Sequence, residues 1–267
     1  MENLAITLIQ SELAWEDKDK NLANFENYFR HLQGNTDLII LPEMFNTGFT
    51  VDPQDIAEDP YGPTFNWMKH QAGLMQCVIT GSIAVHIGKE YFNRLLWMRP
   101  DGTHEVYDKR HLFRYGNEHV HFAPGSKRLV TELKGWKICP LVCYDLRFPV
   151  WSKNTFHEGN YEYDLLIYVS NWPGRRGYAF RQLLIARAIE NQSFVIGINR
   201  IGRDINQTRY HGESVVLDYI GKPIIEMPPD VEYMDTVTLN QDKLSEFREH
   251  FPVALDWDSF MITNVIQ

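Results

Sequence analysis

The feature that most constrains the fold is the shortness of the apolar runs and their alternation with helical patterns. Residues 38–41 read LIIL and residues 165–169 read LLIYV, which are lengths typical of β-strands. Both runs are apolar at every position, as strands covered on both faces are. They are far shorter than the about 20 residues of a membrane-spanning helix, so we expect no membrane segment. The runs favour a layered α/β fold.

Helical patterns lie between the apolar runs. Residues 17–33 are predicted to form a helix because apolar side chains recur there at three- and four-residue steps before Gly34. Two more helices are predicted at residues 64–75 and 179–191. Besides residues 38–41 and 165–169, we predict strands at residues 4–10, 77–85, 94–98, 135–143, 194–199, 212–217 and 224–226, with a loop-rich segment at 109–127. No repeat or flexible linker interrupts the pattern, so a single domain over residues 1–267 is expected.

Charge and cysteine content exclude several classes of function. The formal net charge is −9 and no stripe of Lys and Arg is present, so we expect no nucleic-acid partner. The N-terminus has no basic segment before its first apolar run, which favours the cytoplasm. The cysteines, Cys77, Cys139 and Cys143, are odd in number, so free thiols in a reducing compartment are expected.

Three residues with acid–base or nucleophilic chemistry lie at or near the ends of predicted strands. They are Glu43, Lys109 and Cys143. Taken singly, each has an ordinary interpretation as a solvated cap, a surface charge or a core residue. Cys143 is unusual because an apolar strand ends at it and the charged, aromatic turn YDLR follows. A thiol of ordinary pKa is mostly protonated at neutral pH, so a nucleophilic cysteine needs a base or a neighbouring positive charge.

The segments around these residues carry a family resemblance. LPEMFNTGF surrounds Glu43, VYDKRHLF surrounds Lys109 and LVCYDLRFP surrounds Cys143. In this order they resemble the three signature segments of the nitrilase superfamily of carbon–nitrogen hydrolases. GNEHVHFAPG around Glu118, SNWP at residues 170–173 and RAIENQSFVIGINRIG at residues 187–202 extend the resemblance over most of the chain.

The resemblance implies a fold, a mechanism and an assembly. The fold is a four-layer α-β-β-α sandwich, and the assembly is a homodimer. Cys143 is expected to be the nucleophile, Glu43 the general base, Lys109 the stabiliser of the oxyanion, and Glu118 an accessory glutamate beside Lys109. The scheme implies no cofactor and no metal; the pair Cys139 and Cys143 lacks the second Cys/His pair of a zinc site.

Within the superfamily the chain looks most like the ω-amidase branch. Such enzymes hydrolyse the ω-amide of a small 2-oxo dicarboxylic acid monoamide, 2-oxoglutaramate or 2-oxosuccinamate, to the 2-oxo acid and ammonia. The remote carboxylate of this substrate calls for a basic residue. Arg147, Arg175 and Arg176 are candidates for that contact, and Tyr144 and Trp172 are candidates for the pocket wall.

Alternatives stay open at this point. Arg147 could instead pair with an acid such as Asp145, and Arg175 and Arg176 could be solvated loop residues. The enzyme could be a nitrilase, an aliphatic amidase or an N-carbamoyl amine hydrolase of the same superfamily. A protein of another class would keep the fold as a non-catalytic binding module. A Cys–His hydrolase would use His111, His119, His121 or His211 against Cys143, but none lies in a protease signature. The tail at residues 244–267 could dock through Trp257 and Phe260 on a partner or on the chain itself.

Overall fold

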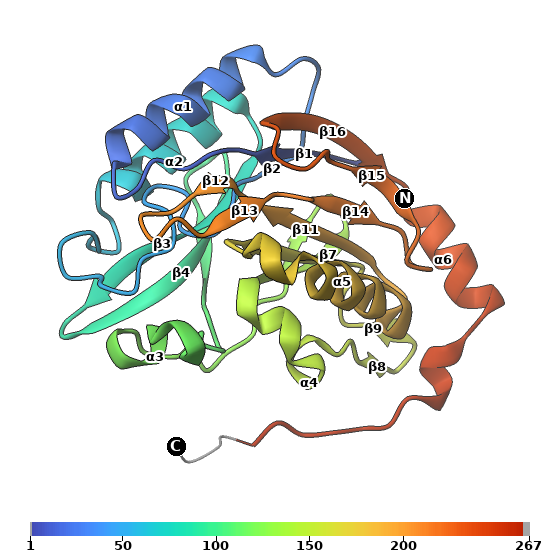
Figure 1. The fold of residues 1–267 in the computed structure, drawn as a ribbon. Helices are drawn as coiled ribbons and strands as arrows, with labels where there is room; N and C mark the ends of the chain where they lie inside the picture. Colours follow the sequence, from blue (N-terminus) through green and yellow to red (C-terminus); the bar gives the residue numbers. More distant parts are fainter. Residues whose placement is uncertain (1, 264–267) are drawn as a thin grey trace.

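Two β-sheets form the centre of the structure, a computed structural model that describes residues 2–263 (Figure 1). Within these residues the first sheet has six strands in the order β16-β1-β2-β3-β4-β5. Their bounds are Tyr233–Leu239, Leu4–Gln10, Leu38–Ile40, Val78–Ile87, Glu90–Met98 and His104–Asp108. Strands β1, β2 and β3 are parallel, and the others join them antiparallel.

The second sheet, also six-stranded over the described part of the chain, has the order β15-β14-β11-β10-β7-β6. Its strands are Pro223–Glu226, Val215–Leu217, Phe194–Asn199, Leu165–Ser170, Trp136–Val142 and Thr131–Leu133. Strands β7, β10 and β11 are parallel. Two short hairpins stand apart, β12 with β13 (Ile201–Arg203, Arg209–His211) and β8 with β9 (Phe156–His157, Asn160–Tyr161).

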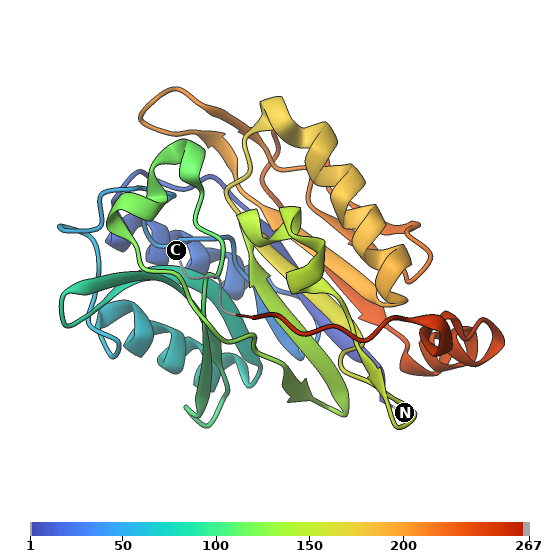
Figure 2. The same cartoon turned by 90° about the horizontal axis from the view of Figure 1, so that it is seen from below.

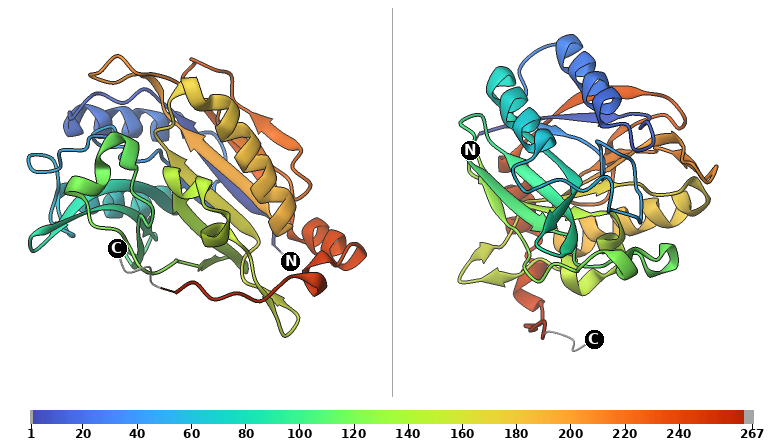
Figure 3. Two further views of the ribbon diagram at one scale, coloured as in Figure 1. Left: turned by 60° about the horizontal axis from the view of Figure 1, so that its bottom comes forward. Right: turned by 90° about the vertical axis from the view of Figure 1, so that its left-hand side faces the viewer.

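Helices cover the outer faces of the two sheets, which gives four layers (Figures 1 and 3). Helices α1 (Lys18–His31) and α2 (Pro63–Met75) pack together, and α2 contacts the first sheet. Helix α5 (Gly177–Asn191) lies on the second sheet, and α6 (Gln241–His250) follows β16. The remaining helices are the short α3 (Glu118–His121) and α4 (Pro149–Ser152). The 3₁₀ turns are η1 (Arg114–Gly116), η2 (Cys143–Arg147), η3 (Gly174–Arg176) and η4 (Val253–Asp256). This is the predicted α-β-β-α sandwich.

The run LIIL shows why its residues are all apolar. Leu38 and Ile40 point into the core between the two sheets, whereas Ile39 and Leu41 join the core beneath α1 and α2. Successive side chains of a strand point to opposite faces, so a strand between two cores needs apolar residues at both. All four side chains are fully buried.

Most predicted elements are present with small shifts at their ends. The strands at residues 4–10 and 194–199 have the predicted bounds. Helix α1 begins one residue later than predicted, because Asp17 caps it by accepting the N–H of Lys20. Sequence reasoning missed β5, β6, β16 and α6, and the predicted loop at 109–127 contains α3. The prediction that the strand includes Cys143 was wrong, since β7 ends at Val142 and Cys143 opens η2.

The segment after η4 runs back past α4 in an extended form (Figure 2). Trp257 packs on this chain: its ring meets Tyr161 edge-on with the ring centroids 5.7 Å apart, and the Lys153 ammonium lies over its face. Phe260 is 42% exposed. Residues 264–267 of the tail lie outside the described residues. The part of the chain that is described contains no helix long and apolar enough to cross a membrane.

Candidate active site

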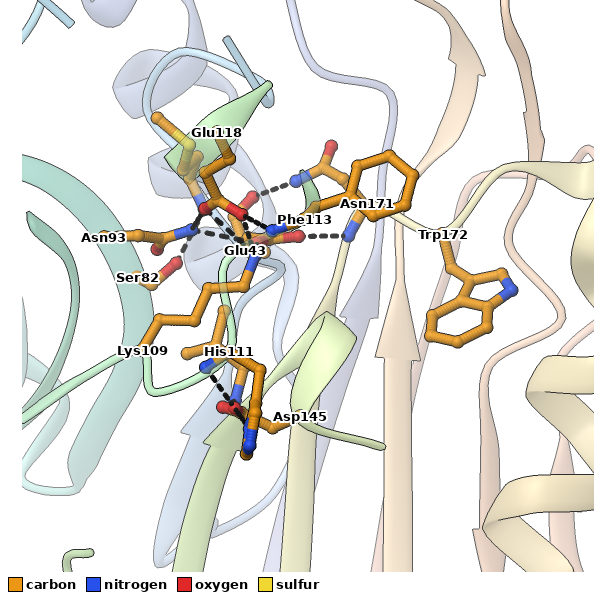
Figure 4. Close-up of polar contacts among 12 residues, drawn as sticks. Glu43, Ser82, Asn93, Lys109, His111, Phe113, Glu118, Asp145, Asn171 and Trp172 are labelled. Atoms are coloured by element: carbon orange, nitrogen blue, oxygen red, sulfur yellow. Dashed lines mark hydrogen bonds and ion pairs between the residues drawn. The ribbon is translucent and has the colours of Figure 1, made fainter. Parts of the chain in front are cut away.

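Glu43, Lys109 and Glu118 form one buried ion-pair cluster (Figure 4). The ammonium of Lys109 donates to Glu43 Oε1 at 2.8 Å and to the two oxygens of Glu118 at 3.0 and 2.9 Å. The three side chains are at most 1% exposed. Glu43 follows β2, Lys109 follows β5 and Glu118 opens α3, so residues far apart in the sequence meet at one edge of the first sheet.

The cluster holds Lys109 in its charged form. Burial by itself would favour the neutral amine, but the carboxyls of Glu118 and Glu43 outweigh burial and raise the pKa of Lys109 above its ordinary value. Burial also raises the pKa of the Glu118 carboxyl, against the opposing effect of Lys109. Lys109 is therefore an ammonium held between two carboxyl groups, which suits a site that must stabilise a developing negative charge.

Cys143 lies beside this cluster, on the first residue after β7. Its φ angle is +41°, in the left-handed region that costs a side chain other than glycine about 1–2 kcal/mol. Met44, next to Glu43, has a φ of +43° as well, and its N–H donates to Ser82 Oγ at 2.9 Å. Both turns are thus held in strained conformations at the edge where the two sheets meet.

The Cys143 thiol is a protonated thiol at rest. Burial raises its pKa well above the ordinary value and the Glu43 carboxylate raises it further, whereas Lys109 and the Asn171 N–H act in the opposite direction. The thiol and the Glu43 carboxylate line the same cavity. Reaction at this sulfur therefore calls for a base that removes the proton during attack, and the carboxylate in position to do so is Glu43.

Asn93 and Asn171 complete the cluster, and sequence reasoning named neither. Asn93 of β4 donates to Glu43 at 2.9 Å and to Glu118 at 3.2 Å. The Asn171 N–H donates to the other oxygen of Glu43 at 2.9 Å, and its side chain donates to the Glu43 carbonyl. No clear signal for Asn93 exists in the sequence, because it is followed directly by Arg94 and precedes the apolar stretch of β4.

Asp145 ties the nucleophile turn to the segment that carries Lys109. Its Oδ2 accepts the Tyr107 hydroxyl at 2.7 Å and the Val142 N–H at 3.1 Å. Its Oδ1 lies 3.0 Å from the His111 backbone nitrogen and 2.8 Å from His111 Nδ1. The interpretation of Arg147 as the ion-pair partner of Asp145 is therefore wrong, since both oxygens of Asp145 are occupied by other donors.

A cavity of about 280 Å³ opens above Cys143. All the predicted site residues except Glu118 line it, namely Glu43, Lys109, Cys143, Tyr144, Arg147, Trp172, Arg175 and Arg176. Glu118 lies behind Lys109. No described residue that lines the cavity is a histidine; His111 and His211 bind Asp145 and Asp230 instead. A cavity of this size suits a small molecule.

Three guanidinium groups surround the mouth of the cavity, and each lies over an aromatic ring. Arg147 lies 4.7 Å from the ring centre of Trp172, Arg176 5.1 Å from Phe113, and Arg175 5.7 Å from Tyr115. Within residues 2–263 none of the three forms an ion pair with a carboxylate. Burial lowers the pKa of Arg176. The positive charges of Arg175 and Arg147 lower it further, so the three guanidinium groups lie close enough to repel one another. Such a rim attracts an anion.

Comparisons with known proteins agree with this fold. Residues 5–249 match the carbon-nitrogen hydrolase family, and the chain belongs to it. It is 42% identical over 262 residues to omega-amidase YafV of Yersinia enterocolitica, covering 98% of this chain and 100% of that protein. It is 29% identical over 254 residues to the 2-oxoglutaramate amidase of Bacillus subtilis, covering 94% and 96% of the two chains.

A solved structure matches over nearly the whole chain. The crystal structure of XC1258 from Xanthomonas campestris, a CN-hydrolase superfamily protein with an arsenic adduct in the active site, has a TM-score of 0.96 and 46% identity. The match covers 98% of this chain and 100% of that one. The resemblance to the nitrilase superfamily and the expected sandwich fold are thereby confirmed.

Proposed function

We propose that this chain is an ω-amidase, which hydrolyses the terminal amide of 2-oxoglutaramate or 2-oxosuccinamate to the 2-oxo acid and ammonia. The observation that carries the proposal is a thiol and an acid–base cluster in a small cavity that is also lined by arginines without an ion-pair partner among the described residues. Cys143 and the neighbouring ion-pair cluster suit the hydrolysis of an amide. The arginines suit a substrate that carries a carboxylate remote from the amide. The names of relatives that include an omega-amidase and a 2-oxoglutaramate amidase support it.

Acylation uses Cys143, Glu43 and Lys109. The sulfur attacks the amide carbon while Glu43 takes the thiol proton, because the raised thiol pKa keeps that proton on sulfur until attack. The Lys109 ammonium and the backbone N–H at the Cys143–Tyr144 turn stabilise the oxyanion of the tetrahedral intermediate. Glu43 then passes the proton to the departing nitrogen, the carbon–nitrogen bond breaks, and ammonia leaves a thioester on Cys143.

Deacylation reverses these roles with water as the nucleophile. Glu43 takes a proton from water as its oxygen attacks the thioester, the carbon–sulfur bond breaks, and the proton returns to the thiolate. Glu118 does not touch the substrate carbon in this scheme; it supports Lys109 by accepting two hydrogen bonds from the ammonium. Asn93 and Asn171 keep Glu43 in place during both steps.

The arginine rim supplies the specificity. Arg176 is the best candidate for the substrate carboxylate because it is half-buried in the cavity that Cys143 also lines, whereas Arg175 is exposed. Arg147 lies on Trp172 and closes the same side of the cavity. Tyr144 and Trp172 form apolar walls along the short chain of the substrate.

The remaining properties are proposed on the family resemblance and the composition. We propose that residues 1–267 form one carbon–nitrogen hydrolase domain that works as a homodimer in the cytoplasm, with a small amide as its partner and no nucleic acid. The net charge of −9 agrees with the absence of a nucleic-acid partner.

Ammonia release from a substrate panel tests the function. The panel contains 2-oxoglutaramate, 2-oxosuccinamate, glutamine, an aliphatic nitrile and an N-carbamoyl amine, each run beside Cys143→Ala. Turnover of the two 2-oxo amides, lost in the variant, is the expected result. Turnover of the nitrile or the carbamoyl compound alone would overturn the substrate class, and residual turnover in Cys143→Ala would overturn the thiol mechanism.

A further inference from the structure

Phe113 touches both the catalytic cluster and the arginine rim. It lies in the loop that follows Lys109, and its backbone N–H donates to Glu118 Oε2 at 2.6 Å. Its carbonyl accepts the N–H of Glu118 at 3.3 Å. The backbone of Phe113 is therefore hydrogen-bonded to both the side chain and the backbone of Glu118.

The N–H of Phe113 fills a specific need of the buried carboxylate. Glu118 is fully buried, and a carboxylate out of water needs a donor at each oxygen. Oε1 receives Lys109 and Asn93, whereas Oε2 receives Lys109 and, among the described residues, one further donor, the Phe113 N–H. Without that bond the carboxylate could turn away from Lys109.

The ring of Phe113 serves the other side of the site. It lines the cavity, its centre lies 5.1 Å from the Arg176 guanidinium, and Tyr144 meets it edge-on at a centroid distance of 5.1 Å. A guanidinium over an aromatic face keeps its N–H donors free at its edge for an anion. One residue thus supports the proposed carboxylate contact and the carboxylate behind the catalytic lysine.

We infer that Phe113 is a positioning residue that joins substrate recognition to catalysis, its N–H holding Glu118 against Lys109 and its ring holding Arg176 over the cavity. The inference rests on the proposed amidase function. It assigns to Phe113 two separable effects: the ring acts on substrate binding, and the N–H acts on the rate of the chemical steps.

The backbone of Phe113 allows the two effects to be separated. Its φ angle is −72°, within the range that proline adopts, so Phe113→Pro removes the N–H at a compatible φ. Phe113→Ala removes the ring and keeps the N–H, and it is the matched control. Comparison of the two variants isolates the hydrogen bond to Glu118.

We expect Phe113→Ala to raise KM for 2-oxoglutaramate by about 10-fold with kcat within about 3-fold of the parent. Phe113→Pro should also lower kcat by about 10- to 100-fold, since it removes a donor to a buried carboxylate. In Phe113→Pro, the acid limb of the pH profile of kcat/KM should move to higher pH. The Phe113 N–H lowers the pKa of Glu118, so its loss raises that pKa further, while the groups facing Glu118, namely Lys109, Glu43 and Asn93, are unchanged.

Two controls keep the test decisive. In a Glu118→Gln background the proline should add no further shift of the acid limb. If Phe113→Pro does not fold, the amide proton shift of Phe113 is followed by NMR in the parent chain. It should titrate together with the acid limb of activity and lose this titration in Glu118→Gln.

Equal kcat and equal pH profiles for Phe113→Pro and Phe113→Ala would overturn the inference, as would an amide shift that does not titrate. These results differ from a failure of the proposed function, in which the parent chain itself releases no ammonia from any 2-oxo amide. The NMR titration requires no turnover, because its reference in that case is the pH dependence of Cys143 alkylation.

Discussion

The two sheets contribute different chemistry to one site. The first sheet supplies the charged groups: Glu43 follows β2, Lys109 follows β5, and Asn93 of β4 bridges the carboxyl groups of Glu43 and Glu118. The single ammonium of Lys109 is shared between the two carboxyl groups through hydrogen bonds in a buried environment. The first sheet therefore provides a rigid acid–base cluster with its proton acceptor already in position.

The second sheet supplies the thiol and the contacts to the substrate. Cys143 follows β7 in a strained turn, Asn171 follows β10, and the arginines of η3 follow Asn171. Arg147, Arg175 and Arg176 have no carboxylate partner among the described residues, unlike Lys109. A cation that is paired with carboxyl groups inside the protein, as Lys109 is, suits catalysis. A cation at the rim that has no carboxylate partner among the described residues suits recognition of an anion. The site exists only where the two sheets meet.

The largest expected effect comes from Lys109→Met, which breaks the cluster of the first sheet. We expect kcat/KM to fall by at least about 10³-fold, and the free energy of unfolding to fall by about 3–5 kcal/mol because two carboxyls lose their buried counter-ion. Both effects are measured by steady-state kinetics and by thermal unfolding.

The stability loss of Lys109→Met should depend on pH in a definite direction. Burial already raises the pKa of Glu118 and Lys109 opposes that rise, so the variant should raise it further. A carboxyl whose pKa is higher in the folded state binds protons on folding, so stability falls as pH rises from the unfolded pKa to the folded one. The loss should thus be larger at about pH 8 than at about pH 5. Equal losses would mean that the carboxyls are not the cause.

A smaller effect is expected from Asp145→Asn, which loosens the link between the sheets. The asparagine side chain has the same shape as aspartate, but its NH₂ group would face N–H and O–H donors. In the parent protein these donors meet a carboxylate oxygen of Asp145. We expect kcat to fall by about 10- to 100-fold and stability by about 2–3 kcal/mol. Tyr107→Phe, which removes one of these donors, is the milder control. Full activity in Asp145→Asn would show that the Cys143 turn holds its shape without this network.

Arg176→Gln tests the recognition role of the second sheet. KM for 2-oxoglutaramate should rise by about 10-fold or more, with little change for an uncharged aliphatic amide, because a charge-assisted hydrogen bond is lost only for the anion. Arg175→Gln and Arg147→Gln form the matched set. A larger effect in either of these would move the carboxylate contact to that arginine.

The smallest effect is expected from Cys139→Ala. Cys139 lies four positions before Cys143 on β7, is fully buried, and its thiol pKa is raised by burial to about 12. Activity should stay within about two-fold, with a stability loss of about 1 kcal/mol from the lost packing. In the native parent chain iodoacetamide should modify Cys143, which lines the cavity, well before Cys77 or Cys139. Equal rates would favour an inert Cys143.

Sequence patterns predicted the central strands because these strands follow a local rule, whereas the roles of Glu43, Lys109 and Glu118 came from the resemblance to the nitrilase superfamily. A strand between two cores must be apolar at each position, and Glu43 and Cys143 interrupt such runs where they end. The edge strands β5, β6 and β16 were missed, since half-exposed strands carry mixed residues such as HEVYD. Asn93 was missed because its partners lie on other segments. The hydrogen bond from Phe113 to Glu118 was missed because a backbone N–H makes it, which any residue but proline could provide.

The most direct test of the account is acylation of Cys143 by an activated substrate. A p-nitrophenyl ester of a small carboxylic acid needs no proton for its leaving group, so it should acylate the thiol faster than the thioester is hydrolysed. We expect a burst of nitrophenolate close to one equivalent per chain, the acyl group on the peptide that carries Cys143, and no burst in Cys143→Ala. A burst that persists in Cys143→Ala, or an acyl group on another residue, would contradict it.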